Sequence, residues 1–97
     1  MTTPERELVR PAFESVDLEI GLDAARDRIE AAVGGLAPSE REELVNYRTA
    51  SGTLVAVVGS PGRRDGATLA YRTAPAALSA TRTASRLRDA LDDVVVE

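Results

Sequence analysis

A run of five apolar residues, Leu54-Val55-Ala56-Val57-Val58, constrains the fold of this chain more than any other stretch. Because the run is apolar at every position, a strand formed here must be buried on both faces, which is typical of an interior strand. On either side, residues 44–49 and 67–73 alternate between apolar and polar side chains. We therefore predict a three-stranded antiparallel meander with the apolar run as its middle strand.

The connections of this meander hold turn-forming residues. Ser51-Gly52 predicts a tight reversal before the apolar run. The Gly59–Gly66 stretch, with eight residues and three glycines, is too long for a minimal hairpin turn. A strand that leads into glycines resembles a phosphate-binding loop, but that pattern needs glycine where Arg64 stands, followed by a lysine. We expect a hairpin loop, and whether it binds an anion stays open.

The first part of the chain predicts a strand and a helix. Phe13 to Ile20 alternates with the period of a half-buried strand. From residue 22 to residue 36, apolar residues recur every three or four positions, which predicts a helix that stops at Gly34-Gly35. Residues 39–48 leave two alternatives. The capping-box spacing predicts one helical turn before a strand, and the competitor is a helix that continues to Arg48.

The last predicted helix begins near Pro75 and runs almost to the C-terminus. Its apolar stripe consists of Ala80, Ala84, Leu87, Leu91 and Val94. At about 100° per residue, the opposite face carries Arg82, Arg86, Asp89 and Asp93. Arginine in the first half and aspartate near the end oppose the helix dipole, at a cost of a few tenths of a kcal/mol per charge. Either tertiary partners compensate this order, or the arginines serve something outside the helix.

These elements predict an α+β fold of the form β-α-β-β-β-α, with a four-stranded, mostly antiparallel sheet and two helices on one face. Residues 1–12 are expected to form a flexible N-terminal arm and residues 13–97 a single domain. The longest apolar run is far below the roughly 20 residues that span a bilayer. The N-terminus shows no secretory signal pattern, so we expect a cytoplasmic protein without membrane contact.

Composition excludes most catalytic chemistry. All twelve basic residues are arginine, and the chain contains no His, Lys, Cys or Trp. It therefore lacks a side chain that titrates near neutrality, a Schiff-base amine, a thiolate nucleophile and soft metal ligands. Two carboxylate clusters lack the spacing of a calcium loop and are expected to be solvated surfaces: Glu40, Glu42 and Glu43, and Asp89, Asp92 and Asp93. We predict no catalytic residue, cofactor or metal, and a non-enzymatic protein.

Charge is distributed unevenly along the chain. Residues 1–50 hold six Arg and eleven acidic residues, whereas residues 63–88 hold six Arg and one Asp. If five of these arginines converged, they would form a patch for RNA or another polyanion: Arg63, Arg64, Arg72, Arg82 and Arg86. Only Tyr71 lies nearby for base stacking. The alternative is that the arginines pair with the acidic residues of the first half.

The preferred interpretation is docking or self-association, and four residues are candidates for the interface. A sheet covered on one face leaves the other open, and Tyr47 or Tyr71 on that face would create an association surface. Ala80 and Ala84, four residues apart, would alternatively allow close approach of another helix. The simpler explanation for these alanines is that the helix crosses near its own sheet.

Two resemblances add to this interpretation. The arginine-only basic residues and excess of acid resemble the composition of proteins from halophilic archaea. The order strand, helix, hairpin, helix, with Ala77-Leu-Ser-Ala-Thr and Leu87 near the second helix, resembles the small non-catalytic subunit of the KEOPS tRNA-modification complex. That resemblance implies a dimeric scaffold protein without an active site. We expect a homodimeric interaction domain, with RNA or polyanion binding as the alternative.

Overall fold

The computed structural model describes residues 13–41, 44–60, 66–73 and 78–96. The predicted N-terminal arm therefore lies outside the described residues. The structure is an α+β fold in which five strands form one antiparallel sheet. The strands are β1 (Phe13–Asp17), β2 (Ala37–Arg41), β3 (Leu44–Arg48), β4 (Leu54–Gly59) and β5 (Thr68–Arg72).

The apolar run forms the central strand, as predicted. The strand order is β1-β5-β4-β3-β2, so β4 has two neighbouring strands on each side. Val55 to Val58 have 0% exposed surface. The reversal before β4 uses Gly52, whose φ of 92° suits glycine far better than any other residue. The meander of β3, β4 and β5 is thus confirmed, and β1 joins it at the outer side of β5.

The sheet has one strand more than predicted. Residues 37–41 form β2, which pairs with β3 from Ala37↔Arg48 to Arg41↔Leu44. Both alternatives for residues 39–48, the helical turn and the longer helix, are therefore wrong, and the element order is β-α-β-β-β-β-α. An isolated helical turn is marginal in water, whereas this segment gains a full ladder with β3. Pro38 is tolerated because β2 is an edge strand.

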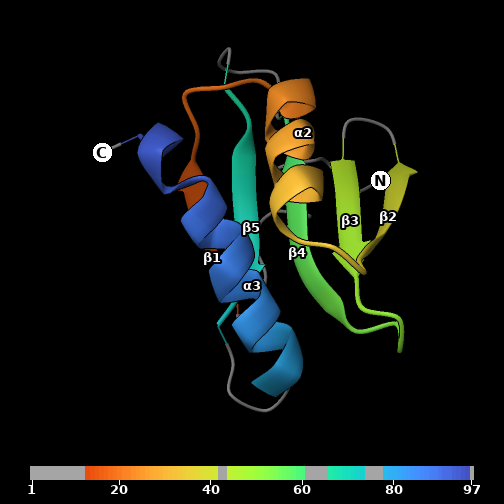
Figure 1. The fold of residues 1–97 in the computed structure, drawn as a ribbon. Coiled ribbons are helices and arrows are strands. Elements are labelled where there is room, and N and C mark those ends of the chain that lie inside the picture. Colours follow the sequence, from red (N-terminus) through yellow and green to blue (C-terminus); the bar gives the residue numbers. More distant parts are fainter. Residues whose placement is uncertain (1–12, 42–43, 61–65, 74–77, 97) are drawn as a thin grey trace.

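Two helices, α2 (Leu22–Ala32) and α3 (Leu78–Ala90), lie on the same face of the sheet (Figure 1). The principal core lies between them and the strands, and Ile29 of α2 and Leu87 of α3 are fully buried in it. The predicted stop of the first helix is confirmed, since α2 ends at Ala32 and Gly35 has a φ of 79°.

The last helix is shorter than predicted. α3 ends at Ala90, and a 3-10 helix, η2 (Asp92–Val94), follows it. Val95 then bridges Leu18, and the Val96 N–H donates to the Asp17 carbonyl at 2.8 Å. The apolar stripe did continue to Val94, but Val94 to Val96 gain hydrogen bonds beside β1 that a longer helix would lose. The C-terminal segment therefore lies beside the end of β1, next to residues 17–19.

The sheet face opposite the helices, here called the second face, is not bare at its centre. Val57 and Ala70 have 0% exposed surface and Leu44 has 6%. Phe13 and Leu54 pack against these three residues. The expectation of an open apolar face is therefore wrong for the middle of the sheet.

None of the helices within the described ranges is long and apolar enough to cross a bilayer.

Two leucines of α3 test this arrangement. Leu87 is fully buried, whereas Leu78 on the same helix is 55% exposed. We expect Leu87→Ala to lower the free energy of unfolding by about 2–5 kcal/mol, because it leaves a cavity in the core. The matched control Leu78→Ala should change it by less than about 0.5 kcal/mol. Urea unfolding followed by circular dichroism measures both, and equal losses in the two variants would contradict the placement of α3.

Candidate functional site

The exposed side of α3 is the candidate site. Its buried side carries Ala80, Ala84 and Leu87, which pack against β4 and β5. The exposed side, here called the α3 face, consists of Leu78, Ser79, Arg82, Ser85, Arg86 and Asp89. Ala80 and Ala84 have 3% and 0% exposed surface, so these two candidate interface residues let α3 approach its own sheet. The simpler explanation for the alanines fits the structure.

The two tyrosines also lie on the helix-covered side of the sheet instead of the second face. Tyr47 has no exposed surface and belongs to the core, so it offers nothing to an interface. Tyr71 is half-buried beside the same core, and its hydroxyl donates to Glu14 at 2.9 Å. Burial and this carboxylate raise the pKa of Tyr71. An association surface on the second face would need both tyrosines on that face. The alternation of β3 and β5 instead points both of them towards the helices.

Three of the five arginines of the predicted polyanion patch are described, and these three do not converge. Arg63 and Arg64 lie outside the described residues. Arg72 is on the second face, where its guanidinium carbon lies 5.0 Å from the centre of the Phe13 ring and its Nε donates to the Leu54 carbonyl at 2.8 Å. Arg82 and Arg86 lie across the sheet from it, on α3. Of the three that are described, the structure brings Arg82 and Arg86 together and leaves Arg72 apart.

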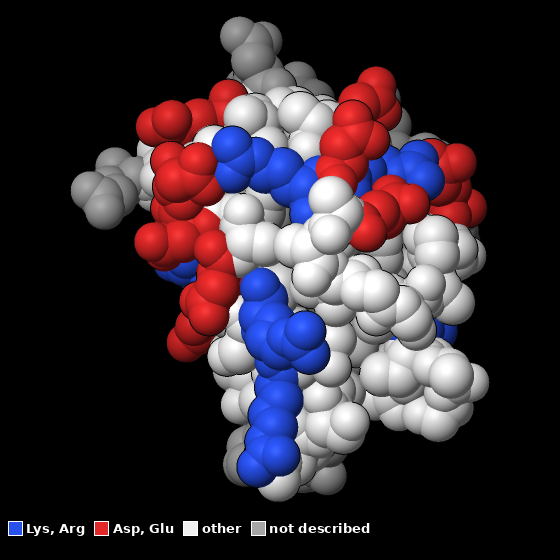
Figure 2. Space-filling model, viewed as in Figure 1, with Lys and Arg blue, Asp and Glu red and all other residues white. Residues whose placement is uncertain are grey.

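Three other arginines of the described chain are paired with carboxylates. Arg26 contacts both Glu30, at 3.5 Å, and Glu40, whereas Arg28 contacts Asp93 and Arg88 contacts Asp92. Within the described ranges, Arg82 and Arg86 form no ion pair. Figure 2 shows a basic stripe along one half of α3 and acidic side chains gathered near its other end. The tertiary structure therefore compensates Asp93 through Arg28 but leaves Arg82, Arg86 and Asp89 without an ion pair within the described ranges.

Three residues of the two carboxylate clusters take part in these ion pairs. Glu40, Asp92 and Asp93 each accept from an arginine, and the contact with Arg28 lowers the pKa of Asp93. Glu42 and Glu43 lie outside the described residues. In the part of the chain that the structure describes, no group of three acidic residues is arranged to hold a metal ion.

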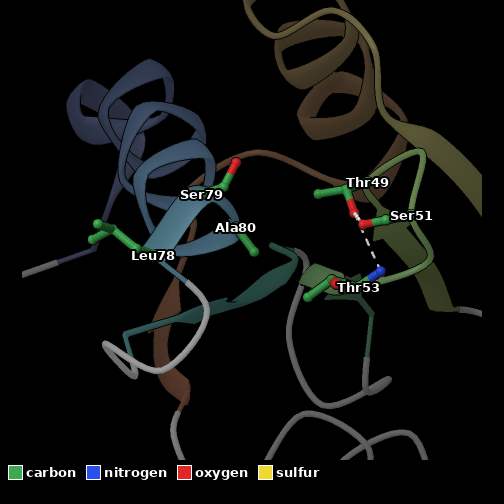
Figure 3. Close-up of a pocket in the computed structure, with 6 residues that line it drawn as sticks. All are labelled: Thr49, Ser51, Thr53, Leu78, Ser79 and Ala80. Atoms are coloured by element: carbon green, nitrogen blue, oxygen red, sulfur yellow. Dashed lines mark hydrogen bonds between the residues drawn. The ribbon is translucent and has the colours of Figure 1, made fainter.

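A small pocket lies beside the start of α3, between this helix and the β3–β4 turn (Figure 3). Its volume is about 250 Å³, and its lining consists of Thr49, Ser51, Thr53, Leu78, Ser79 and Ala80. The Thr49 and Ser51 hydroxyls lie 2.8 Å apart, and the Thr53 N–H donates to Thr49 Oγ1 at 3.2 Å. The lining offers hydrogen bonds but no side chain that ionises near neutrality. Sequence reasoning missed this pocket, although the density of hydroxyl residues around Gly52 was visible.

A buried phenol anchors the corner between α2 and β3. The Tyr47 hydroxyl donates to Glu30 Oε2 at 3.3 Å, and Glu30 also contacts Arg26. Burial, followed by the nearby Glu30 charge, raises the pKa of Tyr47 to about 12. Arg26 acts in the opposite direction on this pKa. The arrangement favours a neutral tyrosine and ties α2 to the sheet, which is a structural role.

The raised pKa of Tyr47 predicts a loss of stability at alkaline pH. The folded chain holds this proton more tightly than the unfolded chain, whose ordinary value is 10.0, so the stabilisation is complete below pH 10 and is lost as the pH rises towards about 12. We expect the free energy of unfolding to fall by no more than about 3 kcal/mol over that range. Denaturant unfolding at a series of pH values measures it, and Tyr47→Phe should remove most of the decrease.

The variant Tyr71→Phe is the matched control, because it leaves Tyr47 as the sole tyrosine. In this variant, the tyrosinate absorbance comes from Tyr47 and should rise near pH 12. A rise near pH 10 in a chain that circular dichroism shows to be folded would contradict the buried placement of Tyr47.

Comparison with protein-family models, with curated proteins and with solved structures gives no match for this chain. The resemblances in composition and element order therefore stay predictions.

Proposed function

We propose that this chain is a small non-enzymatic interaction domain that self-associates, and that the α3 face is its contact surface. One observation carries the proposal. Arg82 and Arg86 are exposed on the same helix face and form no ion pair within the described ranges. Arg26, Arg28 and Arg88 each pair with a carboxylate, and Arg72, which has no ion pair within the described ranges, contacts Phe13 and Leu54 on the second face. Two neighbouring exposed arginines without a carboxylate partner favour binding to a surface that supplies negative charge.

Other surfaces are less suited to association. The second face is buried at its centre. The outer edge of β2 is interrupted by Pro38, which has no N–H to donate, and by the charged Glu40, both of which discourage strand addition. The C-terminal segment already bonds to Asp17 at the end of β1 and to Glu19 beyond it. These features disfavour strand addition at β2 and at the end of β1, and favour the α3 face as the contact surface.

The alternative is binding of RNA or another polyanion through the same two arginines. The structure lends it less support, because Arg72 is across the sheet and engaged with Phe13 and Leu54. Salt does not separate the two functions here, since a charged helix interface and a phosphate contact both weaken as ionic strength rises. The mass of the protein without nucleic acid separates them directly.

Sedimentation equilibrium tests the proposal. We expect the wild-type protein to show a concentration-dependent mass that approaches twice 10.3 kDa. Arg82→Gln and Arg86→Gln should each weaken the association by about three- to tenfold, because each removes a charge from two symmetry-related contacts. The matched control is Arg48→Gln, since Arg48 also lacks an ion pair within the described ranges but is half-buried, and the alternation of β3 places it on the second face.

A wild-type mass that stays at 10.3 kDa up to several hundred micromolar would contradict self-association. If Arg48→Gln weakened the dimer as much as Arg86→Gln, the contact surface would not be the α3 face.

A further inference from the structure

We infer that the partner of the α3 face is the α3 face of a second copy of this chain, packed antiparallel across a two-fold axis that passes between Arg86 and Asp89. This inference rests on the proposed function and specifies its geometry. The α3 face is basic at Arg82 and Arg86 and acidic at Asp89, and η2 continues the acidic end with Asp92 and Asp93. The same surface therefore presents both halves of a charge-complementary contact.

The spacing of the charges suits a two-fold axis. At about 100° per residue, Arg82, Arg86 and Asp89 fall within roughly 60° of one another around the helix. In a two-fold interface, residue i of one copy meets residue j of the other, and j meets i. An axis between positions 86 and 89 brings Arg86 opposite Asp89 of the second copy, twice. A parallel arrangement would instead place arginine against arginine and aspartate against aspartate.

The outer arginine also finds acceptors in this arrangement. Counting outward from the axis, Arg82 comes opposite the η2 region of the second copy. Asp92 and Asp93 there contact Arg88 and Arg28 of their own chain, respectively. A carboxylate has two oxygens and about four lone-pair sites, so each can accept from a second arginine.

The antiparallel arrangement also uses the helix dipole. Arg82 and Arg86 lie between the first and last turns of α3, where the dipole of their own helix has little effect. The second helix runs in the opposite direction, so its negative C-terminal end at Ala90 lies beside these arginines. The pairing therefore adds a favourable contact between the arginines of one copy and the helix end of the other.

The exposed apolar side chains fit the same pairing. Among the described residues, the exposed large hydrophobic side chains are Leu78 at 55% and Val96 at 39%. Leu78 starts α3, and Val96 follows its C-terminal end. An antiparallel pair brings Leu78 of each copy towards the end of the other helix from which Val96 continues. With one helix from each copy in contact, the interface is small, and we expect a weak, reversible dimer.

Charge exchange between positions 86 and 89 tests the inference. In sedimentation equilibrium, Arg86→Glu and Asp89→Arg should each weaken the dimer by about tenfold, because each creates like-charge contacts twice. The double variant R86E/D89R should return to wild-type association within about threefold, since both contacts are attractive again. An equimolar mixture of the two single variants should form a heterodimer. Circular dichroism confirms that the variants are folded, which is expected because both side chains are exposed.

The outcomes separate this inference from the function on which it rests. A wild-type dimer whose double variant stays as weak as the single variants would overturn the antiparallel register and leave self-association standing. A dimer that none of the substitutions affects would place the interface elsewhere. A monomeric wild-type protein that binds a generic single-stranded RNA through Arg86 would overturn both and establish the polyanion alternative.

Discussion

Burial of β4 on both faces is the constraint on which the structure depends. A strand with Val55 to Val58 fully buried requires a neighbour at each edge and cover above and below. β3 and β5 supply the edges, and α2 and α3 supply the cover on one side. Their apolar stripes are used up in this packing, which is why Ala80, Ala84 and Leu87 are unavailable for anything else. Apart from Leu78 and Val96, the surface that the described residues of α3 and the C-terminal segment present to partners is therefore mostly polar and charged.

The sequence predicted the helices and strands whose apolar residues recur regularly and are buried in the fold. The alternation of residues 13–17 and 68–72, the helical stripe from residue 22 and the stop at Gly34-Gly35 all correspond to elements of the structure. β2 could not be predicted in this way, since Ala37 to Glu40 are exposed and show no alternation. Its strand conformation comes from pairing with β3, which a local capping pattern does not reveal.

The candidate site was predicted in part, for a similar reason. The helical period correctly placed Arg82, Arg86 and Asp89 on the exposed side of α3. It could not tell that Arg72 lies on the second face, or that Tyr47 and Tyr71 lie beneath the helices, because the phase of a strand relative to the helices is set by packing. Helical spacing also could not foresee that α3 ends at Ala90, since the segment beyond it bonds to β1.

We propose that two copies pack through antiparallel α3 faces, and an electron–electron distance tests this arrangement most directly. The chain has no cysteine, so Ser79→Cys gives one spin-label site on the exposed start of α3. With a rise of 1.5 Å per residue and helices about 10 Å apart, the antiparallel pair places the two labelled positions roughly 27 Å apart. A distance near that value supports the account. A distance below about 15 Å, as a parallel pair would give, or the absence of any dipolar coupling at concentrations where the dimer forms, would contradict it.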